Sequence, residues 1–489
     1  MSEDSQAELE GSRRFHIRTY GCQMNVHDSQ KIANLLAHAG FAASDDGEAA
    51  DLLVVNTCSI REKAENRLYT DLGLLREWKA RRPGRLLGVA GCVAQQEGDE
   101  ILRRFAEVDF VCGTHNLRLV PALVAAAERG RRSLRTDEDP TRARFELPER
   151  HPGLSNPTPG RAFVTVMEGC DMFCSFCIVP TTRGREVSRS ADSILEEVRG
   201  LADAGVVEVT LLGQTVNAYG RHDLRRGRAD AEGTTSFAAL LAALDAVPGI
   251  ERIRYTSPHP IFFDEALVEA HAALPSLCPH VHLPVQSGSD AVLAAMRRRY
   301  TADAVRELVG RLRAARPDLA LTTDLIVGFP GETDADFRAT LELVRDADFV
   351  DSYSFKYSPR PGTAAAERSD RVPPELAQER LEALQEQQRG QTLAAHRARV
   401  GGRAEVLVEG TSRRGDQLSG RDPQHRLFNL TAPAESGPRP AAEPGPRPGD
   451  RVWVRAVEAT PRSLIGEIEA PRLQRSLRRA DEQGHHVRL

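Results

Sequence analysis

The chain has 489 residues, a formal net charge of −5 at pH 7 and 40% hydrophobic residues. This length exceeds what one hydrophobic core organises and suggests about three domains. The composition is that of a globular protein. The sequence contains no apolar run of the ~20 residues needed to cross a bilayer. The net charge gives no global signal for nucleic-acid binding.

The first residues and the cysteines indicate the cellular compartment. Residues 1–13 are expected to form a disordered tail, and their acidic, polar start is wrong for a secretory signal peptide. We therefore expect a cytoplasmic protein that does not associate with membranes. Its eight cysteines are then more often metal ligands than disulfide partners.

A repeating strand–helix pattern runs from residue 14 to about residue 130. Strands are predicted at 14–20, 52–56, 86–90 and 108–111, and helices at 28–38, 61–81 and 97–105. Asp28 or Ser29 is the expected N-cap of the first helix. Short helical crossovers between strands predict a parallel sheet, so the domain is of the α/β class.

A cysteine follows each of these four strands within two residues: Cys22, Cys58, Cys92 and Cys112. The carboxyl ends of parallel strands share one edge of a sheet, so these thiols can converge. A single buried cysteine is usually an inert small hydrophobe, but the periodic placement favours a metal site for the group. Spacing alone leaves Cys112 open as a ligand.

Residues 131–155 are polar, contain proline and lack periodicity, which predicts a linker. An apolar strand at 162–167 then runs into a loop that carries Cys170, Cys174 and Cys177 in the order C-x3-C-x2-C. Three thiolates so close together can bind three irons of one [4Fe-4S] cluster and leave the fourth iron open. A zinc loop or a disulfide knot is less favoured, because zinc prefers four closing ligands and C-x2-C pairs.

The pattern of strands and helices recurs through the rest of a central domain at 156–395. Further strands are predicted near 206–212, 252–256, 280–285, 319–327 and 351–357, and a long charged helix near 374–399. Six β-α units predict a (β/α)6 partial barrel. The Arg/Gly/Asp-rich stretch 220–235 is expected to be a surface insertion. His259 and His282 are expected to form hydrogen bonds at strand ends, and Cys278 to stay unligated.

Short strands at 404–410, 427–430, 451–457 and 463–468 predict a small five-stranded barrel of the oligonucleotide-binding type at 396–470. A Pro-rich stretch at 433–448 is expected to be a mobile loop, and residues 471–489 a tail. Phe428 and Trp453 can stack on bases, but core packing is the favoured interpretation of both rings.

The C-x3-C-x2-C loop resembles the radical S-adenosylmethionine (SAM) enzymes. Its flanks, Met167-Glu168-Gly169-Cys170-Asp171 and Ile178-Val179-Pro180-Thr181-Thr182-Arg183-Gly184, resemble the methylthiotransferases among them. The segments TYGCQMN around Cys22, NTC ending at Cys58 and GC ending at Cys92 resemble the three ligand motifs of that family. The resemblance implies that Cys22, Cys58 and Cys92 hold a second [4Fe-4S] cluster, that Cys112 is a packing residue, and that the last domain is a TRAM domain.

The resemblance also assigns roles in the reaction. It implies that Cys170, Cys174 and Cys177 are catalytic through the cluster that binds SAM. One SAM methylates sulfur at the first cluster, and a second SAM supplies a radical that lets a methylthio group replace hydrogen. Loops after the strands match the family in order, and this implies SAM-binding roles for Gly213, Gln214, Asn217, Gln286, Ser287 and Asp324.

Within the family, CQMN at Cys22, GQTVN at Gly213 and FKYSPR at Phe355 resemble the branch that acts on N6-dimethylallyladenosine in tRNA, although Thr215 stands where that branch often has Asn. This implies the tRNA anticodon stem-loop as substrate, an electron donor such as flavodoxin or ferredoxin, and a monomer. Sibling enzymes that act on threonylcarbamoyl-adenosine or on a ribosomal-protein aspartate are the alternatives. A non-catalytic iron–sulfur or RNA-binding protein is the alternative from another class.

Overall fold

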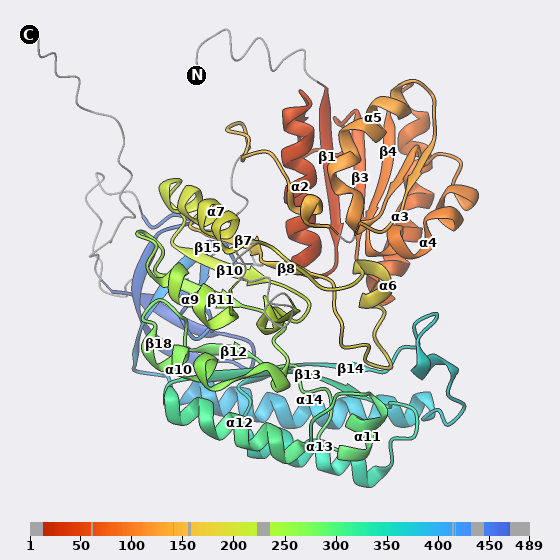
Figure 1. Ribbon diagram of the computed structural model, residues 1–489. Coiled ribbons are helices and arrows are strands. Elements are labelled where there is room, and N and C mark those ends of the chain that lie inside the picture. The colour runs from red at the N-terminus through yellow and green to blue at the C-terminus, as the bar shows by residue number, and fades with distance from the viewer. Residues whose placement is uncertain are drawn as a thin grey trace, which may run out of the picture.

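The computed structural model describes residues 13–59, 62–139, 141–154, 158–222, 235–412, 415, 417–431 and 445–469. The two expected tails, most of the expected insertion at 220–235 and most of the Pro-rich stretch lie outside the described residues. The chain forms an N-terminal sheet domain, a central domain built on two sheets and a C-terminal barrel (Figure 1).

The N-terminal domain is built on a six-stranded sheet in which every pair of neighbouring strands is parallel. The spatial order is β2 (Ala42–Ala43), β1 (Arg14–Tyr20), β3 (Leu52–Thr57), β4 (Leu86–Gly91), β5 (Phe110–Cys112) and β6 (Ser133–Arg135). The predicted parallel sheet is therefore confirmed. The sheet also continues through β6 into residues 131–155, which were expected to be a linker.

Helices cover both faces of this sheet (Figure 1). α2 (Gln23–His38) and α5 (Val120–Glu128) bury Ile32 and Val124 in the core on one face. α3 (Glu62–Ala80) and α4 (Cys92–Arg104) bury Leu72 and Val93 in the core on the other face. α2 leaves β1 toward one face of the sheet and α3 leaves β3 toward the other, so the connections change sides between these two strand ends. Open α/β sheets bind their ligands at such points.

Two helices begin earlier than the sequence pattern predicts. The N-cap of α2 is Cys22, whereas Asp28 or Ser29 was predicted, and α4 begins at Cys92, whereas a start near residue 97 was predicted. Neither cap makes a side-chain hydrogen bond, so the usual capping signal is missing. A non-helical residue, Glu97, interrupts α4 close to the predicted start.

Six parallel strands form the core of the central domain. β7 (Arg161–Thr165), β10 (Glu208–Leu212) and β11 (Arg252–Tyr255) make one sheet. β12 (His280–His282), β13 (Ala320–Val327) and β14 (Asp351–Lys356) make the next sheet. Ile253 and Leu277 bridge the gap between the two sheets, and one apolar core runs under both. This arrangement matches the predicted partial barrel.

Helices cover the outer side of these strands: α7 (Ala191–Asp203), α9 (Phe237–Asp245), α10 (Glu265–Ala273), α11 (Asp290–Ala295), α12 (Ala302–Ala315), α13 (Asp334–Asp346) and α14 (Pro374–Arg397). Two short strands, β8 (Met167–Glu168) and β9 (Val187–Ser188), pair antiparallel beside the cysteine loop, and α6 (Val179–Arg183) follows that loop. α6 lies against the N-terminal domain, where the Thr114 hydroxyl donates a hydrogen bond to the Thr182 carbonyl.

The C-terminal domain is a closed five-stranded barrel, as predicted. Its strands are β15 (Arg403–Thr411), β16 (Leu418–Arg421), β17 (Leu427–Thr431), β18 (Arg451–Ala459) and β19 (Leu464–Ile468), of which β16 was not predicted. Phe428 packs in the barrel core, but Trp453 is 40% exposed with the Arg403 guanidinium over its ring. The prediction of core packing is therefore wrong for Trp453.

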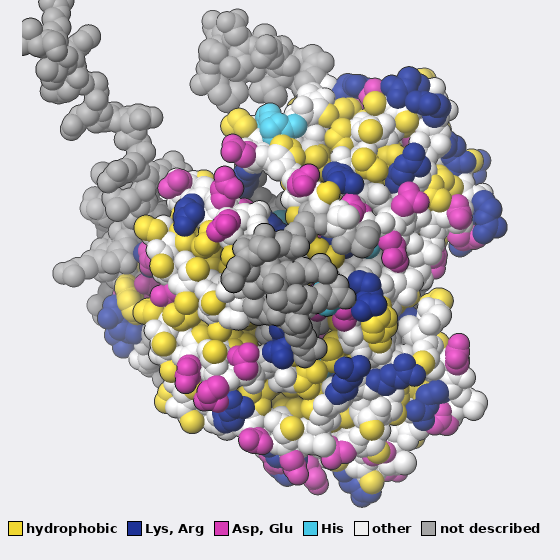
Figure 2. Space-filling view, in the orientation of Figure 1, with side chains coloured by type: hydrophobic (Ala, Val, Ile, Leu, Met, Phe, Trp, Pro, Cys, Tyr) yellow, Lys and Arg dark blue, Asp and Glu magenta, His cyan; other side chains and the backbone are white. Residues whose placement is uncertain are grey.

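The barrel rests on the edge of the central domain at β11, where Arg252 and Arg254 donate hydrogen bonds to the carbonyls of Arg421 and Asp422. On the face seen in Figure 2, basic and acidic side chains are interspersed over the N-terminal and central domains. Within the described residues, no helix combines the length and the apolar character needed to cross a membrane.

Candidate metal centres

Three of the predicted ligands lie at the ends of adjacent strands in the N-terminal sheet. The register pairs Tyr20 with Thr57 and Thr57 with Gly91, so β1, β3 and β4 end side by side. Cys22, Cys58 and Cys92 come directly after these ends, and the Cys58 amide donates to the Tyr20 carbonyl over 2.9 Å. The sheet therefore gathers three thiols that lie far apart in the sequence, which we call the sheet-edge site.

Two glycines make the close approach at the sheet-edge site possible. Gly21 has a φ of +136°, and a Cβ atom placed on it would lie 2.3 Å from the Cβ atom of Cys58. Gly91 has a φ of +95°, and a Cβ atom there would lie 2.2 Å from the Asn56 side-chain oxygen. A larger residue at either position meets both backbone strain and a collision.

The pKa values of two thiols at this site are shifted in opposite directions. Cys22 caps the N-terminus of α2 and Cys92 is the first residue of α4, and a helix N-terminus favours a thiolate. A hydrogen bond with the Cys58 thiol, aided by the charge of Arg183, lowers the pKa of Cys22. Burial raises the pKa of Cys92, and the charge of Arg183 opposes that rise.

A buried amide pair holds the strand ends in place beside the thiols. The Asn56 amide donates to the Asn25 carbonyl over 2.8 Å and to the Ser29 hydroxyl over 2.9 Å. The Asn25 amide in turn donates to the Asn56 side-chain oxygen over 3.3 Å, and the Cys22 thiol lies 3.3 Å from the Asn25 side-chain oxygen. The network thus ties the start of α2 to the end of β3.

Arg183 reaches the sheet-edge site from the central domain. It ends α6, and its Nη2 donates to Oδ2 of Asp28 on α2 over 2.6 Å. The side chains of Arg183 and Asp28 are only 4% and 1% exposed, so the ion pair is dry. Nearby, Lys31 pairs with Glu168 at 3.0 Å, and this contact again joins the two domains.

Cys112 is the last residue of β5 and lies in the apolar core on the α2 face of the sheet, together with Phe110 and Val124. Its thiol contacts the Gly113 carbonyl at 3.6 Å, and burial raises its pKa to about 12. This environment is that of a packing residue, as the resemblance implies.

The second set of thiols, which we call the loop site, lies on one loop between β8 and α6. The Cys170 thiol is 3.2 Å from the Thr215 hydroxyl, and Nη1 of the buried Arg298 donates to the Cys174 thiol over 3.5 Å. Burial raises the pKa of Cys170, and it raises the pKa of Cys177 to about 12. Gly169 opens the loop with a φ of +83°, and a Cβ atom there would lie 2.1 Å from the Arg185 carbonyl oxygen.

The residues that follow β10 hold the loop site from one side. A Cβ atom on Gly213 would come within 2.7 Å of the Met167 side chain, so glycine permits this packing. The side-chain oxygen of Gln214 accepts a hydrogen bond from the Gly169 amide, while its Nε2 is buried without a partner among the described residues. The Asn217 side chain donates to the His259 carbonyl over 3.0 Å and accepts from the His259 amide over 2.8 Å.

The other predicted SAM-binding residues lie at the ends of β12 and β13. Gln286 has a φ of +74°, and its backbone pairs with β13. The Ser287 hydroxyl is buried beside the Thr340 hydroxyl at 3.2 Å. Asp324 lies 3.3 Å from Nε2 of His282, and both side chains are partly exposed. Among these three residues, Asp324 has the side chain that remains most open to a ligand.

The two histidines form the hydrogen bonds that were predicted for them. His259 accepts a hydrogen bond from the Ile261 amide, and Nδ1 of His282 lies 2.9 Å from the Thr322 hydroxyl, so both histidines form hydrogen bonds at strand ends. Cys278 is buried, and burial raises its pKa to about 11. Within the described residues, no three His, Cys, Asp or Glu side chains are placed to hold one metal ion. In a cubane cluster each thiolate binds a different iron, so its ligands are spread more widely.

Sequence reasoning did not predict the exposure of two aromatic residues on β14, one of which, Phe355, begins the FKYSPR motif. Tyr353 and Phe355 are 56% and 41% exposed, which is unusual for large rings on a strand of a barrel. They pair in register with Asp324 and Ile326 of β13, and Tyr353 meets His282 edge-on at 5.9 Å between ring centroids. The alternation of aromatic and polar residues in this strand was the available signal.

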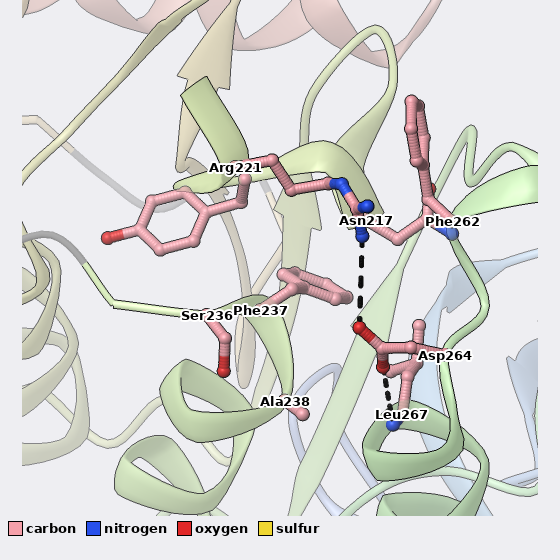
Figure 3. A pocket seen from close by; sticks show the side chains of 9 residues that line it. Asn217, Arg221, Ser236, Phe237, Ala238, Phe262, Asp264 and Leu267 are labelled. Carbon is pink, nitrogen blue, oxygen red and sulfur yellow. Dashed lines mark hydrogen bonds and ion pairs between the residues drawn. The ribbon is translucent and has the colours of Figure 1, made fainter. Parts of the chain in front are cut away.

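A separate pocket of about 210 Å³ lies between the start of α9 and the start of α10 (Figure 3). Arg221 extends across it toward Asp264, with 3.8 Å between their charged atoms, and its guanidinium lies over the Phe262 ring. Of the predicted site residues, Asn217 also lines this pocket, although its amide is already bound to the His259 backbone.

Comparison with known proteins shows which families this chain resembles. Residues 14–113 match the family described as "Uncharacterized protein family UPF0004", and residues 164–344 match the radical SAM superfamily. The chain is 47% identical over 460 residues to the tRNA-2-methylthio-N(6)-dimethylallyladenosine synthase of Geobacter metallireducens, covering 94% of this chain and 99% of that protein. It is also 47% identical to the enzyme of the same name from Cereibacter sphaeroides, covering 93% and 98%.

Among solved structures, the radical S-adenosylmethionine methyltransferase TsrM from Kitasatospora setae, with cobalamin and a [4Fe-4S] cluster bound, superposes with a TM-score of 0.51. The sequences are 16% identical, and the match covers 73% of this chain and 77% of TsrM. At this level of identity the likeness concerns the fold alone.

Proposed function

The chain belongs to the family of tRNA-2-methylthio-N(6)-dimethylallyladenosine synthases, and from this premise we propose that it adds a methylthio group to N6-dimethylallyladenosine next to the anticodon of tRNA. The observation that carries the proposal is the presence of two separate sites of three thiols in one member of this family. The named relatives favour the prenylated adenosine over the sibling substrates.

We propose that the sheet-edge site and the loop site each hold a [4Fe-4S] cluster. The donor sets fit, because each site offers three thiols and so leaves one iron of a four-iron cluster free for another ligand. Buried donors lie beside both sets: Nη1 of Arg183 and Nε2 of Gln214 have no hydrogen-bond partner among the described residues. When bound, the loop cluster would supply the electron that cleaves SAM, and the radical would take the hydrogen from the adenine carbon.

The protein's own residues position these groups. Thr215 and Arg298 hold the cysteine loop through Cys170 and Cys174, and Gln214 fixes the backbone at Gly169. We propose that SAM binds beside the loop site, where the nearby residues after β10, β12 and β13 are Gln214, Asn217, Gln286 and Ser287. Asp324 offers a carboxylate to SAM.

We also propose that the three domains begin near residues 14, 156 and 396.

A tRNA substrate implies a reaction in the cytoplasm, and a cluster that must be reduced requires an electron donor. We propose flavodoxin or ferredoxin as this donor and expect the enzyme to act as a monomer. The C-terminal barrel has the shape of oligonucleotide-binding domains, and its exposed Trp453 is suited to contact RNA.

The test is mass analysis of tRNA from a strain that lacks this gene, before and after complementation. We expect the 2-methylthio mark on the prenylated adenosine to disappear and to return with the intact gene. A mark that persists in the deletion strain would contradict the proposed substrate. Complementation with the Cys170→Ala variant is the matched control, which should not restore the mark.

A further inference from the structure

We propose that Arg183 is a positioning residue for the cluster at the sheet-edge site. Its guanidinium supplies a positive charge beside the thiolates and so raises the reduction potential of the cluster. This inference rests on the proposed function, because it requires a cluster at Cys22, Cys58 and Cys92. It adds a residue that comes from the other domain, at the end of the helix that follows the loop site.

The first argument is the unused hydrogen-bonding capacity of Arg183. Its Nη2 donates to Asp28, while its buried Nη1 has no partner of normal hydrogen-bond geometry among the described residues, and the Cys92 thiol lies within hydrogen-bonding range of the guanidinium. A buried guanidinium nitrogen without an acceptor is costly, so an acceptor is expected beside it. The hydroxyls of Thr57 and Ser59, on either side of Cys58 in the chain, are likewise buried without partners among those residues.

The second argument is the position of the charge. The buried ion pair with Asp28 holds the guanidinium at the boundary of the sheet-edge site, close enough to Cys22 and Cys92 for its charge to reach both. A positive charge fixed beside a cluster stabilises the further negative charge that the cluster gains on reduction. Net charge and hydrogen bonds to sulfur set the potential of iron–sulfur clusters.

The third argument is that the other nearby anions do not need Arg183. Glu168 is already held by Lys31 at 3.0 Å and by Arg144 at 3.8 Å. Asp28 takes one terminal nitrogen of Arg183 and leaves the other free for the site. The pair Asp28–Arg183 therefore orients the guanidinium, in the way that a carboxylate orients a metal-binding histidine.

The experiment measures the potential of the sheet-edge cluster alone. The full chain carrying Cys170→Ala, Cys174→Ala and Cys177→Ala is reconstituted anaerobically, its iron and sulfide are determined, and the cluster is titrated by electron paramagnetic resonance. Three further substitutions are compared in this background: Arg183→Gln, Arg183→Lys and Asp28→Asn.

The charge argument predicts opposite shifts. Arg183→Gln should move the potential to more negative values, Asp28→Asn should move it to more positive values, and Arg183→Lys should stay near the parent. Because Arg183→Gln and Asp28→Asn both break the same ion pair, a purely structural role would move them in the same direction. If the variants that hold the cluster show equal shifts of its potential, or no shift, the inference is overturned.

Two further outcomes keep this inference separate from the proposed function. If the parent itself binds no iron, the two-cluster proposal fails, and with it the premise for Arg183. If Arg183→Gln alone loses its cluster, Asp28→Asn decides: a positive shift supports the inference, and a negative or absent shift overturns it.

Discussion

The sheet-edge site and the loop site each consist of three cysteines, but the fold brings the two sets together in opposite ways. The loop site takes Cys170, Cys174 and Cys177 from one short segment, so the chain itself keeps its thiols together. The sheet-edge site takes Cys22, Cys58 and Cys92 from three strands, and only the strand register keeps them together. The first is a local motif, whereas the second is a property of the folded sheet.

This difference has a consequence for stability. A loop of neighbouring thiols can bind metal while the surrounding structure is still loose, but thiols on three strands meet only when the sheet is complete. A cluster bound at the proposed sheet-edge site would therefore stabilise the whole N-terminal domain against unfolding. The two sites should respond differently to the same kind of damage.

The largest effects are expected from removing a ligand at either site. Cys170→Ala and Cys22→Ala should each lower the methylthiolation rate by more than about 100-fold, because ligands matter more than their supporting residues. Cys170→Ala should also abolish SAM cleavage, whereas Cys22→Ala should retain it. The measurements are 5′-deoxyadenosine formation, tRNA mass analysis and iron content, which should fall by about half in each variant. Loss of SAM cleavage in both variants would contradict separate roles.

A methyl group on one glycine at each site should disrupt that site selectively. Gly21→Ala forces a contact with Cys58, and Gly169→Ala forces a contact with the Arg185 carbonyl. Backbone strain alone costs about 1–3 kcal/mol at positive φ. We expect Gly21→Ala to lose sheet-edge iron and keep SAM cleavage, and Gly169→Ala to show the reverse.

The control is Gly84→Ala, which has a φ of +88° but no atom within 4 Å of the added Cβ. It reports the strain without the collision, so it should keep the iron of both sites. Equal iron loss in all three variants would show that general instability, and not the local contact, is responsible.

A smaller effect is expected from the amide network that supports the sheet-edge site. Asn56→Ala removes the amide that donates to the Asn25 carbonyl and to the Ser29 hydroxyl, although Ser29 keeps its hydrogen bond with Thr19. Removing one partner from a buried pair costs about 1–3 kcal/mol. Thermal unfolding of the metal-free protein should show this loss, and sheet-edge iron should bind more weakly. Thr70→Ala, which removes an exposed hydroxyl hydrogen-bonded to the Asn66 carbonyl on α3, should have little effect on either measurement.

The smallest effect is expected at the fourth strand end. Cys112→Ala removes a buried thiol from the apolar core and should cost about 1 kcal/mol, which is typical of single substitutions. Iron and sulfide content should match the unchanged protein after reconstitution. Reduced iron binding in Cys112→Ala would assign Cys112 to the sheet-edge site after all.

The cysteine loop and the positions of most strands were predictable from the sequence, because both depend on local patterns. Hydrophobic runs marked the strands, and C-x3-C-x2-C marked the loop. The starts of α2 and α4 were not predictable in this way. Asp28 has the character of an N-cap, but the fold uses its carboxylate to bind Arg183, a residue 155 positions away.

The same limit applies wherever a residue's role depends on distant parts of the chain. Trp453 alternates with apolar residues and so predicts core packing, yet it lies outside the barrel under Arg403. β6 is only three residues long and is recognisable as a strand only because β5 offers it a free edge. Arg183 lies in the flank that resembles the family, but nothing in the sequence places it beside Cys22 and Cys92.

The Asp28–Arg183 pair also bears on the order in which the protein matures during synthesis. Chains fold from the N-terminus as they leave the ribosome, so Cys22, Cys58 and Cys92 emerge before Arg183 does. Until α6 arrives, Asp28 has Lys31 beside it at 3.9 Å but lacks the closer ion pair with Arg183. Because an incompletely compensated buried charge is destabilising, the sheet edge around Asp28 is expected to reach its full stability after the segment that carries the loop site has also been synthesised.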